Sequence, residues 1–147
     1  MRMSTRGRYG VRAMIELARH EGHGPTLLKD IARAEGISAE YLEQLMVPLR
    51  TAKLLRSVRG AKGGYFLARP PDQIRLKEII SALEGDLMPV HCVAEPERCV
   101  RASTCAAREV WSEVAEAIDK VLNRITLADL AARQEALRSA DGARYEI

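Results

Sequence analysis

The chain has 147 residues, 47% of them hydrophobic, which is enough to bury one core without disulfide bonds. It contains no apolar run approaching the roughly 18 residues of a membrane span, and its first residues are polar and basic, unlike a signal peptide. These features exclude membrane proteins and small disulfide scaffolds, and we expect a cytoplasmic protein that does not contact a membrane.

The net charge of +3 is unevenly distributed along the chain. Residues 1–70 hold 13 Lys and Arg against 6 Asp and Glu, whereas residues 71–147 hold 10 against 14. A basic first half predicts binding to a polyanion. Because only 4% of the residues are aromatic, few rings are available to stack on single-stranded bases, and the expected polyanion is double-stranded DNA.

A first helix is predicted from Ser4 or Thr5, either of which can cap it, to about Glu21. Arg6 and Arg8 lie near its start, where cations oppose the helix dipole. A DNA phosphate compensates such a placement, and a solvated cluster of cations is the alternative. The residues expected to face the core are Val11, Met14, Ile15 and Ala18.

Residues 26–50 predict two short helices joined by a tight turn. Thr26 caps the first, which ends near Ala34, and Gly36 supplies the left-handed conformation that stops it. The second begins after Ser38, and such a pair suits a helix that enters the major groove of DNA. Gln can bridge two adenine atoms there, and Glu can accept from cytosine. The residues expected at the DNA are Ser38, Glu40, Glu43, Gln44 and Arg50.

Residues 54–58 and 65–67 predict a β-hairpin, since β-branched and aromatic residues favour strands. All long side chains of the intervening loop are cationic, so this wing can follow the DNA backbone and place Arg59 in the minor groove, with Gly60 and Lys62 beside it. A protein-interaction module with a solvated loop is the alternative. No Gly-Lys-Ser/Thr motif closes the loop, so it is not a nucleotide site.

A helix predicted from Lys77 to Glu84 ends at Gly85 and closes a winged domain of residues 1–85. Residues 86–105 have low apolar content and two prolines, so no regular secondary structure is expected there. Such a long loop is uncommon in a compact domain unless it has a function. It holds the three cysteines of the chain, Cys92, Cys99 and Cys105.

Residues 106–147 predict a long helix and a return helix. Thr126 and Asp129 form a capping box that starts the return helix, which runs to about Ser139 before a frayed tail. It is expected to fold back on the winged domain through Leu127, Leu130, Ala131 and Leu137. Too little chain surrounds the long helix to cover its heptad seam, which predicts pairing with a second copy; packing within one chain is the alternative. The seam consists of Trp111, Val114, Ile118, Val121 and Ile125.

The cysteine loop admits several chemical roles. A disulfide is disfavoured by a reducing compartment and by the odd number of thiols. Inert cysteines normally lie in apolar elements, whereas a polar, proline-containing loop can wrap around a metal centre. The spacing lacks the close cysteine pairs of zinc knuckles, although zinc and thiol oxidation stay open as alternatives.

Several short motifs stand together along the chain: Arg6-Gly7-Arg8-Tyr9, Gly36-Ile37-Ser38, Tyr41-Leu42-Glu43-Gln44-Leu45, Ser57-Val58-Arg59-Gly60 and Gly63-Gly64-Tyr65. As a set they resemble the IscR-type winged-helix regulators of the Rrf family, bacterial transcription factors of which many carry an iron–sulfur cluster. The resemblance covers the chain to about Leu137. It implies a homodimer on a pseudo-palindromic DNA operator, with a two-iron, two-sulfur (2Fe-2S) cluster held by the three cysteines.

The fourth cluster ligand departs from the pattern that the resemblance implies. Related chains place a histidine three residues after the last cysteine, and here that residue is Arg108, whose guanidinium has no lone pair to donate. Some relatives use an acidic group near position 8 of the partner chain, and here that residue is Arg8. Glu109 is the preferred fourth ligand, because the start of a helix holds a side chain more firmly than a loop does. His91, next to Cys92, is the alternative.

We therefore predict a mostly helical winged helix-turn-helix protein with a small β-hairpin wing and a long dimerisation helix. Its expected function is that of a homodimeric transcriptional regulator, not an enzyme, whose operator affinity follows iron–sulfur, redox or nitric oxide status. The alternatives are a cluster-free regulator controlled by a metabolite, zinc, thiol oxidation or a partner protein, and a redox enzyme or cluster carrier. The scattered histidines and the lack of a nucleophile beside a base disfavour an enzyme.

Overall fold

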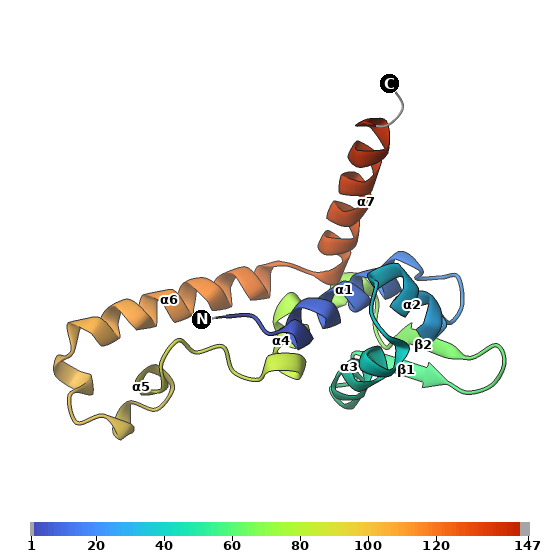
Figure 1. The fold of residues 1–147 in the computed structure, drawn as a ribbon. Helices are drawn as coiled ribbons and strands as arrows, with labels where there is room; N and C mark the ends of the chain where they lie inside the picture. The colour runs from blue at the N-terminus through green and yellow to red at the C-terminus, as the bar shows by residue number, and fades with distance from the viewer. Residues whose placement is uncertain (1, 145–147) are drawn as a thin grey trace.

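The structure, a computed structural model, describes residues 2–144 (Figure 1). It is mostly helical with a two-stranded antiparallel hairpin, as predicted. None of the described helices is long and apolar enough to cross a bilayer. The elements are α1 (Thr5–Arg19), α2 (Leu28–Glu35), α3 (Ala39–Thr51), β1 (Leu55–Val58), β2 (Gly64–Leu67), η1 (Pro71–Gln73), α4 (Leu76–Glu84), α5 (His91–Ala94), η2 (Pro96–Arg98), η3 (Ala102–Thr104), α6 (Ala106–Arg124) and α7 (Leu127–Arg144).

The helix starts and the turn of the predicted helix pair are confirmed with one correction. Ser4 and Ser38 cap α1 and α3 through their hydroxyl oxygens, and Gly36 ends α2 in the left-handed conformation at φ 66°. Thr26 does not cap α2, which Leu27 precedes instead. The backbone of Thr26 pairs with Tyr65 of β2, so the residue extends the wing sheet and is not free to turn into a helix.

The core of the winged domain lies where α1, α2, α3, α4 and the base of the hairpin meet. Leu55 of β1 is paired with Leu67 of β2, and both side chains are buried while the loop beyond them is exposed. Of the stripe predicted for α1, Met14 and Ala18 are buried, whereas Val11 and Ile15 pack at the edge of the core. The largest fully buried side chains are Met14, Ile31, Leu42, Leu45, Met46, Leu49, Leu54, Leu55, Ile74, Ile79 and Leu127.

Helices α1 and α4 approach each other closely because α1 presents glycines at the contact. A Cβ on Gly10 would lie 2.2 Å from Leu83 Cδ1, and a Cβ on Gly7 would lie 2.4 Å from Glu84 Oε1. Leu83 is only 5% exposed, so displacing its side chain would disturb the packed core. The last turn of α4 is therefore seated in a notch on α1.

The segment from residue 86 to residue 105 is not structureless, contrary to the prediction. It winds through one short α-helix and two 3₁₀ turns, closed by local hydrogen bonds such as Glu95 N to His91 O at 2.9 Å. Prolines do not prevent this, because Pro96 stands at the first position of a turn, where no amide donor is needed. The segment lies beneath the far end of α6, distant from the wing (Figure 1).

Helix α6 projects away from the winged domain, and α7 turns off at its end (Figure 1). The predicted capping box is confirmed: Thr126 N donates to Asp129 Oδ2 at 2.9 Å, and Asp129 N donates to Thr126 Oγ1 at 3.1 Å. Leu127 is fully buried in the core, but Leu137 is 67% exposed and does not fold back as predicted. The helix also runs past Ser139 to Arg144, and the end of the predicted frayed tail, residues 145–147, lies outside the described residues.

An ion network fastens α7 to α1 and limits how far α7 follows the domain surface. Glu16 is 6% exposed, and its carboxylate forms ion pairs with Arg19 at 3.1 Å and with Arg138 of α7 at 3.4 Å. Arg19 also pairs with Glu135 at 3.0 Å. Because Arg138 reaches inward to this buried carboxylate, the neighbouring Leu137 points away from the domain.

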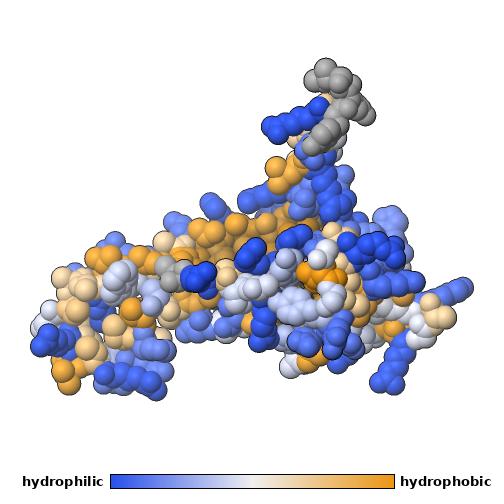
Figure 2. Space-filling model, in the orientation of Figure 1, coloured by the Kyte–Doolittle hydropathy of each residue, from blue (hydrophilic) through white to orange (hydrophobic). Residues whose placement is uncertain are grey.

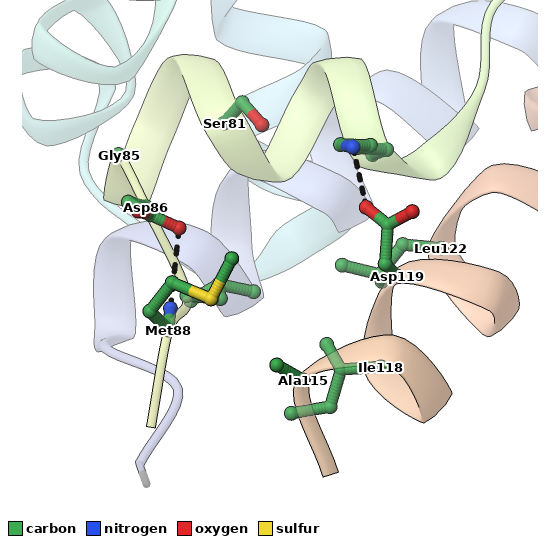
Figure 3. Close-up of a pocket in the computed structure, with 10 residues that line it drawn as sticks. Ser81, Gly85, Asp86, Met88, Ala115, Ile118, Asp119 and Leu122 are labelled. Carbon is green, nitrogen blue, oxygen red and sulfur yellow. Dashed lines mark hydrogen bonds and ion pairs between the residues drawn. The ribbon is translucent and has the colours of Figure 1, made fainter. Parts of the chain in front are cut away.

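Helix α6 is attached to α4 by a surface ion pair between Lys77 and Asp119 (Figure 3). The hydrogen bond from Lys77 lowers the pKa of Asp119 below its ordinary value of 3.8. Below this pair, Leu87, Met88 and Ile118 line a small pocket between α4, α6 and the start of the 86–105 segment. The junction of the two helices thus combines an ion pair, a few apolar contacts and a backbone hydrogen bond from Leu76 N to the carbonyl of Ile125.

We predict that Gly10→Ala destabilises the fold, because its Cβ would overlap the buried Leu83. Overpacking of this kind costs about 1–3 kcal/mol, measurable by urea unfolding. Gly142→Ala is the matched control: nothing lies within 4 Å of its Cβ, and alanine in a helix should stabilise by up to about 1 kcal/mol. Equal effects of the two substitutions on stability would show that Gly10 is not needed for the close packing of α4 on α1.

We also predict that the ion pair between α4 and α6 is sensitive to acid. The lowered pKa of Asp119 means that its contribution is present above the unfolded pKa, about 4, and is lost as pH falls through the folded pKa. Asp119→Asn should therefore be less stable than wild type at pH 7, with the difference narrowing toward pH 3 in urea titrations. Glu116→Gln, an exposed neighbour on α6, should show no such convergence.

Candidate nucleic-acid interface and cysteine segment

The outward face of α3 is mostly polar, with Val47 also exposed. Glu40, Glu43 and Gln44 are exposed, and none forms an ion pair or side-chain hydrogen bond within residues 2–144. Ser38 precedes them, with its hydroxyl oxygen accepting from Tyr41 N at 3.1 Å. The buried residues on the opposite side of the helix hold this face outward. Its side chains are therefore free to contact a partner.

The wing extends the same surface with positive charge. Arg59 and Lys62 are exposed at the tip of the hairpin, and no ion pair involves them in the described part of the chain. Gly60 turns the loop at φ 109°, and its carbonyl accepts from Gly63 N at 2.9 Å. Arg50 of α3 donates to the hydroxyl of Ser57 on β1 at 3.3 Å, and this hydrogen bond joins α3 to the wing.

The first turn of α1 lies beside α3 and carries two more exposed cations, Arg6 and Arg8. A phosphate partner and solvation are the two alternatives that the sequence left open for these cations near the helix start. The chain itself supplies a carboxylate there, because Glu84 Oε1 accepts from Ser4 N at 3.2 Å and from Gly7 N at 3.0 Å. The two arginines are thus available for a polyanion, but the helix dipole does not require one.

A cluster of aromatic and charged side chains fixes the spacing of α1, α2 and α3. The rings of Tyr9 and Tyr41 meet edge to face with centroids 6.3 Å apart. Arg12 stacks 5.1 Å from the centroid of the Tyr9 ring and pairs with the buried carboxylate of Glu35 at 2.5 Å. The Tyr9–Tyr41 contact joins α1 to α3 and the Arg12–Glu35 pair joins α1 to α2, so together they position α3 relative to the start of α1.

The three cysteines lie on separate turns of the 86–105 segment. Cys92 is in α5, Cys99 follows η2 and Cys105 precedes α6; all three are free thiols of intermediate exposure. Among the described residues, no group of three His, Cys, Asp or Glu side chains is gathered closely enough to hold a metal ion. His91 and Glu109 are exposed. The thiols suit iron in chemical kind, but a metal would have to draw them together.

Arg108 makes a structural contact at the position where the family resemblance implies a cluster ligand. Its Nε donates to the carbonyl of Cys92 at 2.9 Å, and the side chain is half-buried between α6 and α5. This bond fastens the first cysteine turn to the first turn of α6. The sequence did not predict this hydrogen bond, because it showed only that residue 108 is an arginine, which cannot bind a metal.

The seam predicted on α6 divides into two parts. Trp111 and Val121 are exposed by 42% and 45%, and Val110 beside them by 52%. Hydrophobic residues cover much of α6 in the view of Figure 2. Ile125 is a correction: it is 8% exposed, and its carbonyl accepts from Leu76 N at 2.9 Å, so it closes the junction with α4 within the chain. The remaining seam residues, Val114 and Ile118, are half-buried.

Comparison with known proteins gives consistent matches over almost the whole chain. The family described as Rrf2, iron-dependent transcriptional regulator, matches residues 3–133. The transcriptional regulator CymR of Bacillus subtilis is 45% identical over 140 residues, covering 95% of this chain and 96% of that protein. The regulator IscR of Sodalis glossinidius is 40% identical over 141 residues, covering 96% and 85%.

Solved structures agree with these matches. The structure of CymR, described as the global cysteine regulator of B. subtilis, has a TM-score of 0.78 at 45% identity and covers 90% of this chain and 98% of that chain. The structure of T. potens IscR has a TM-score of 0.73 at 42% identity and covers 100% and 93%. The fold and the class of protein, a transcriptional regulator and not an enzyme, are those predicted.

We predict that Arg108→Ala loosens the cysteine segment. Loss of the bond to the Cys92 carbonyl removes an attachment that, for a hydrogen bond from a charged group, is worth about 1.5–3 kcal/mol. Iodoacetamide should then label Cys92 several-fold faster in native protein, measured by peptide mass spectrometry. Arg101→Ala, an exposed arginine of the same segment, is the control. Identical rates in all three proteins would show that Arg108 does not hold this turn.

Proposed function

This chain belongs to the Rrf2 family of transcriptional regulators, and from that premise we propose that it is a homodimer that binds a DNA operator, with an affinity set by an iron–sulfur cluster at its three cysteines. The observation that carries the DNA-binding part is the unpaired polar face of α3 beside the cationic wing tip. The proposed parts are a DNA-binding unit of residues 1–85, a sensor segment of residues 86–105 and a dimerisation unit of residues 106–147, working in the cytoplasm.

Helix α3 is proposed to read the major groove. Gln44 is suited to bridge N6 and N7 of an adenine, and Glu43 to accept from N4 of a cytosine. Ser38, Glu40 and Arg50 lie at the two ends of the same face, in reach of bases or backbone. This assignment draws support from the exposure of the face and from the absence of competing contacts within residues 2–144.

The flanking cations are proposed to hold the DNA backbone. Arg59 is suited to the minor groove, where a narrow groove concentrates negative potential, with Gly60 letting the loop approach closely and Lys62 on a phosphate. Arg6 and Arg8 would contact phosphates on the side of α1. These contacts position the reading helix, whereas the side chains of α3 supply the sequence preference.

A second copy of the chain is proposed to pair along α6. The exposed Trp111 and Val121, together with Val114 and Ile118, provide an apolar strip too long for one chain to cover. A two-fold pair would set two α3 helices about 34 Å apart on successive turns of DNA, which requires a pseudo-palindromic operator.

The proposed 2Fe-2S cluster would be held by Cys92, Cys99 and Cys105, with Glu109, or alternatively His91, as the fourth ligand. Bound there, it would supply metal–thiolate bonds and a redox-active centre. The chain's own residues would determine how firmly it is kept. Arg108 cannot act as a ligand. A rearrangement that brings the three thiols together would have to keep or break the hydrogen bond from Arg108 to the Cys92 carbonyl. A labile cluster that reports iron–sulfur, redox or nitric oxide status fits this ligand set.

A second candidate is a cluster-free regulator that responds through its thiols, zinc, a metabolite or a partner protein. It is favoured by the ungathered cysteines among the described residues and by the Arg108 attachment. The similarity to a protein described as a global cysteine regulator is compatible with it. Both candidates share the same DNA surface and the same responsive segment.

For DNA binding, we predict that Glu43→Ala changes sequence preference by about 1–3 kcal/mol at one base pair. Arg59→Ala should weaken binding to all sequences and reduce the slope of log K against log salt by about 1. Fluorescence anisotropy on selected operators at several salt concentrations measures both. Arg133→Ala, an exposed arginine on α7, is the control. If neither variant differs from it, the interface is misplaced.

For the cluster, we predict that anaerobically purified protein is coloured, with about two iron and two sulfide per chain. Each of Cys92→Ala, Cys99→Ala and Cys105→Ala should lose both, whereas Arg108→His should retain them longer in air because imidazole can ligate. If the wild-type protein is colourless and still binds its operator, the cluster hypothesis is wrong and the second candidate, a cluster-free regulator, stands.

A further inference from the structure

The last residue of α4 joins two parts of the molecule that are far apart in sequence. Glu84 is followed directly by Gly85 and the cysteine segment. Its Oε1 accepts from Ser4 N at 3.2 Å and from Gly7 N at 3.0 Å, and it also contacts the Ser4 hydroxyl. A carboxylate is well suited to this place, since it meets the unsatisfied amides and the positive end of the α1 dipole.

The last turn of α4 packs closely against α1 because two residues of α1 have no side chain. Gly7 admits the Glu84 oxygen to a position that any side chain would occupy, because a Cβ there would lie 2.4 Å from it. Gly10 does the same for Leu83, which is 5% exposed. Rotation or sliding of the final turn of α4 would therefore disturb these contacts. A displacement of the cysteine segment that is transmitted through Gly85 would strain the charge-assisted hydrogen bonds of Glu84 or move the first turn of α1.

The first turn of α1 is in turn coupled to the reading helix. Tyr9 meets Tyr41 edge to face at 6.3 Å, and Tyr41 N is the amide that Ser38 caps at the start of α3. The same turn of α1 carries Arg6 and Arg8. One carboxylate, one helical turn and one aromatic pair thus separate the cysteine segment from the proposed base-reading residues.

We propose that Glu84 is the positioning residue that couples the state of the cysteine segment to the DNA-reading surface. The inference rests on the proposed function, because it names the connection between its two sites. Glu84 does not contact DNA or a cluster; it sets the placement of the α1 start relative to α4. A coupling residue has to be demonstrated by the loss of coupling when it is changed, rather than by its position between two sites.

The probe is N-ethylmaleimide, which reacts with free thiols, and all three cysteines of the chain lie in the 86–105 segment. The direct readout is the exchange rate of the Gly7 amide by NMR, since this amide donates to Glu84. The functional readout is operator affinity before and after capping. The variants are Glu84→Ala and Glu84→Gln, which keeps the shape and one acceptor oxygen without the charge. Glu97→Gln, an exposed carboxylate within the segment, is the matched control.

In wild type and in the control, capping should change Gly7 exchange about fivefold or more, the effect of about 1 kcal/mol of local stability, and should change operator affinity. In Glu84→Ala both responses should vanish, and in Glu84→Gln both should shrink. Should Glu84→Ala fail to fold, the Gln variant alone decides. An unchanged Gly7 rate in capped wild type, or equal responses in all variants, would overturn the proposal. A Gly7 response without a change in operator affinity would keep the Glu84 connection and refute regulation by the segment.

Discussion

The close approach of α4 to α1 determines how the remaining parts of the molecule are placed. Two glycines one helical turn apart on α1 allow Leu83 and Glu84 to sit where side chains would otherwise stand. From this contact the chain leads directly into the cysteine segment, while the other end of α4 is bound to α6 through Lys77 and Asp119. The proposed reading and sensing parts therefore share one packed junction.

The ion pairs among the described residues leave the cations around the outward face of α3 unpaired. The acidic residues with a structural role are paired inward, as Glu16 is with two arginines and Glu35 is with Arg12. The cations at the wing tip and at the start of α1 have no such partners within residues 2–144. A surface that keeps unpaired positive charge beside a polar helix face is suited to a polyanion, since its binding requires no internal ion pair to break.

The cysteine segment combines local order with weak attachment. Short turns close on themselves, and Arg108 is one of the few contacts that hold them to α6. Weakly attached elements of this kind rearrange at a lower cost in free energy than the packed core does. Its position at the outer end of α6, away from the core, means that such a change need not disturb the fold (Figure 1).

The sequence by itself determined the starts of α1 and α3, the glycine turn between α2 and α3, the hairpin and the capping box, because each depends on residues within a few positions of one another. It also identified Glu43 and Gln44 as exposed candidates from the helical periodicity, and Arg59 from the cationic side chains of the hairpin loop. Only the tertiary structure decided that Thr26 pairs with the wing, that Ile125 closes the α4 junction and that Glu84 caps α1. These contacts join residues some 40 to 80 positions apart, and local patterns carry no information about which distant backbone will supply the missing partner.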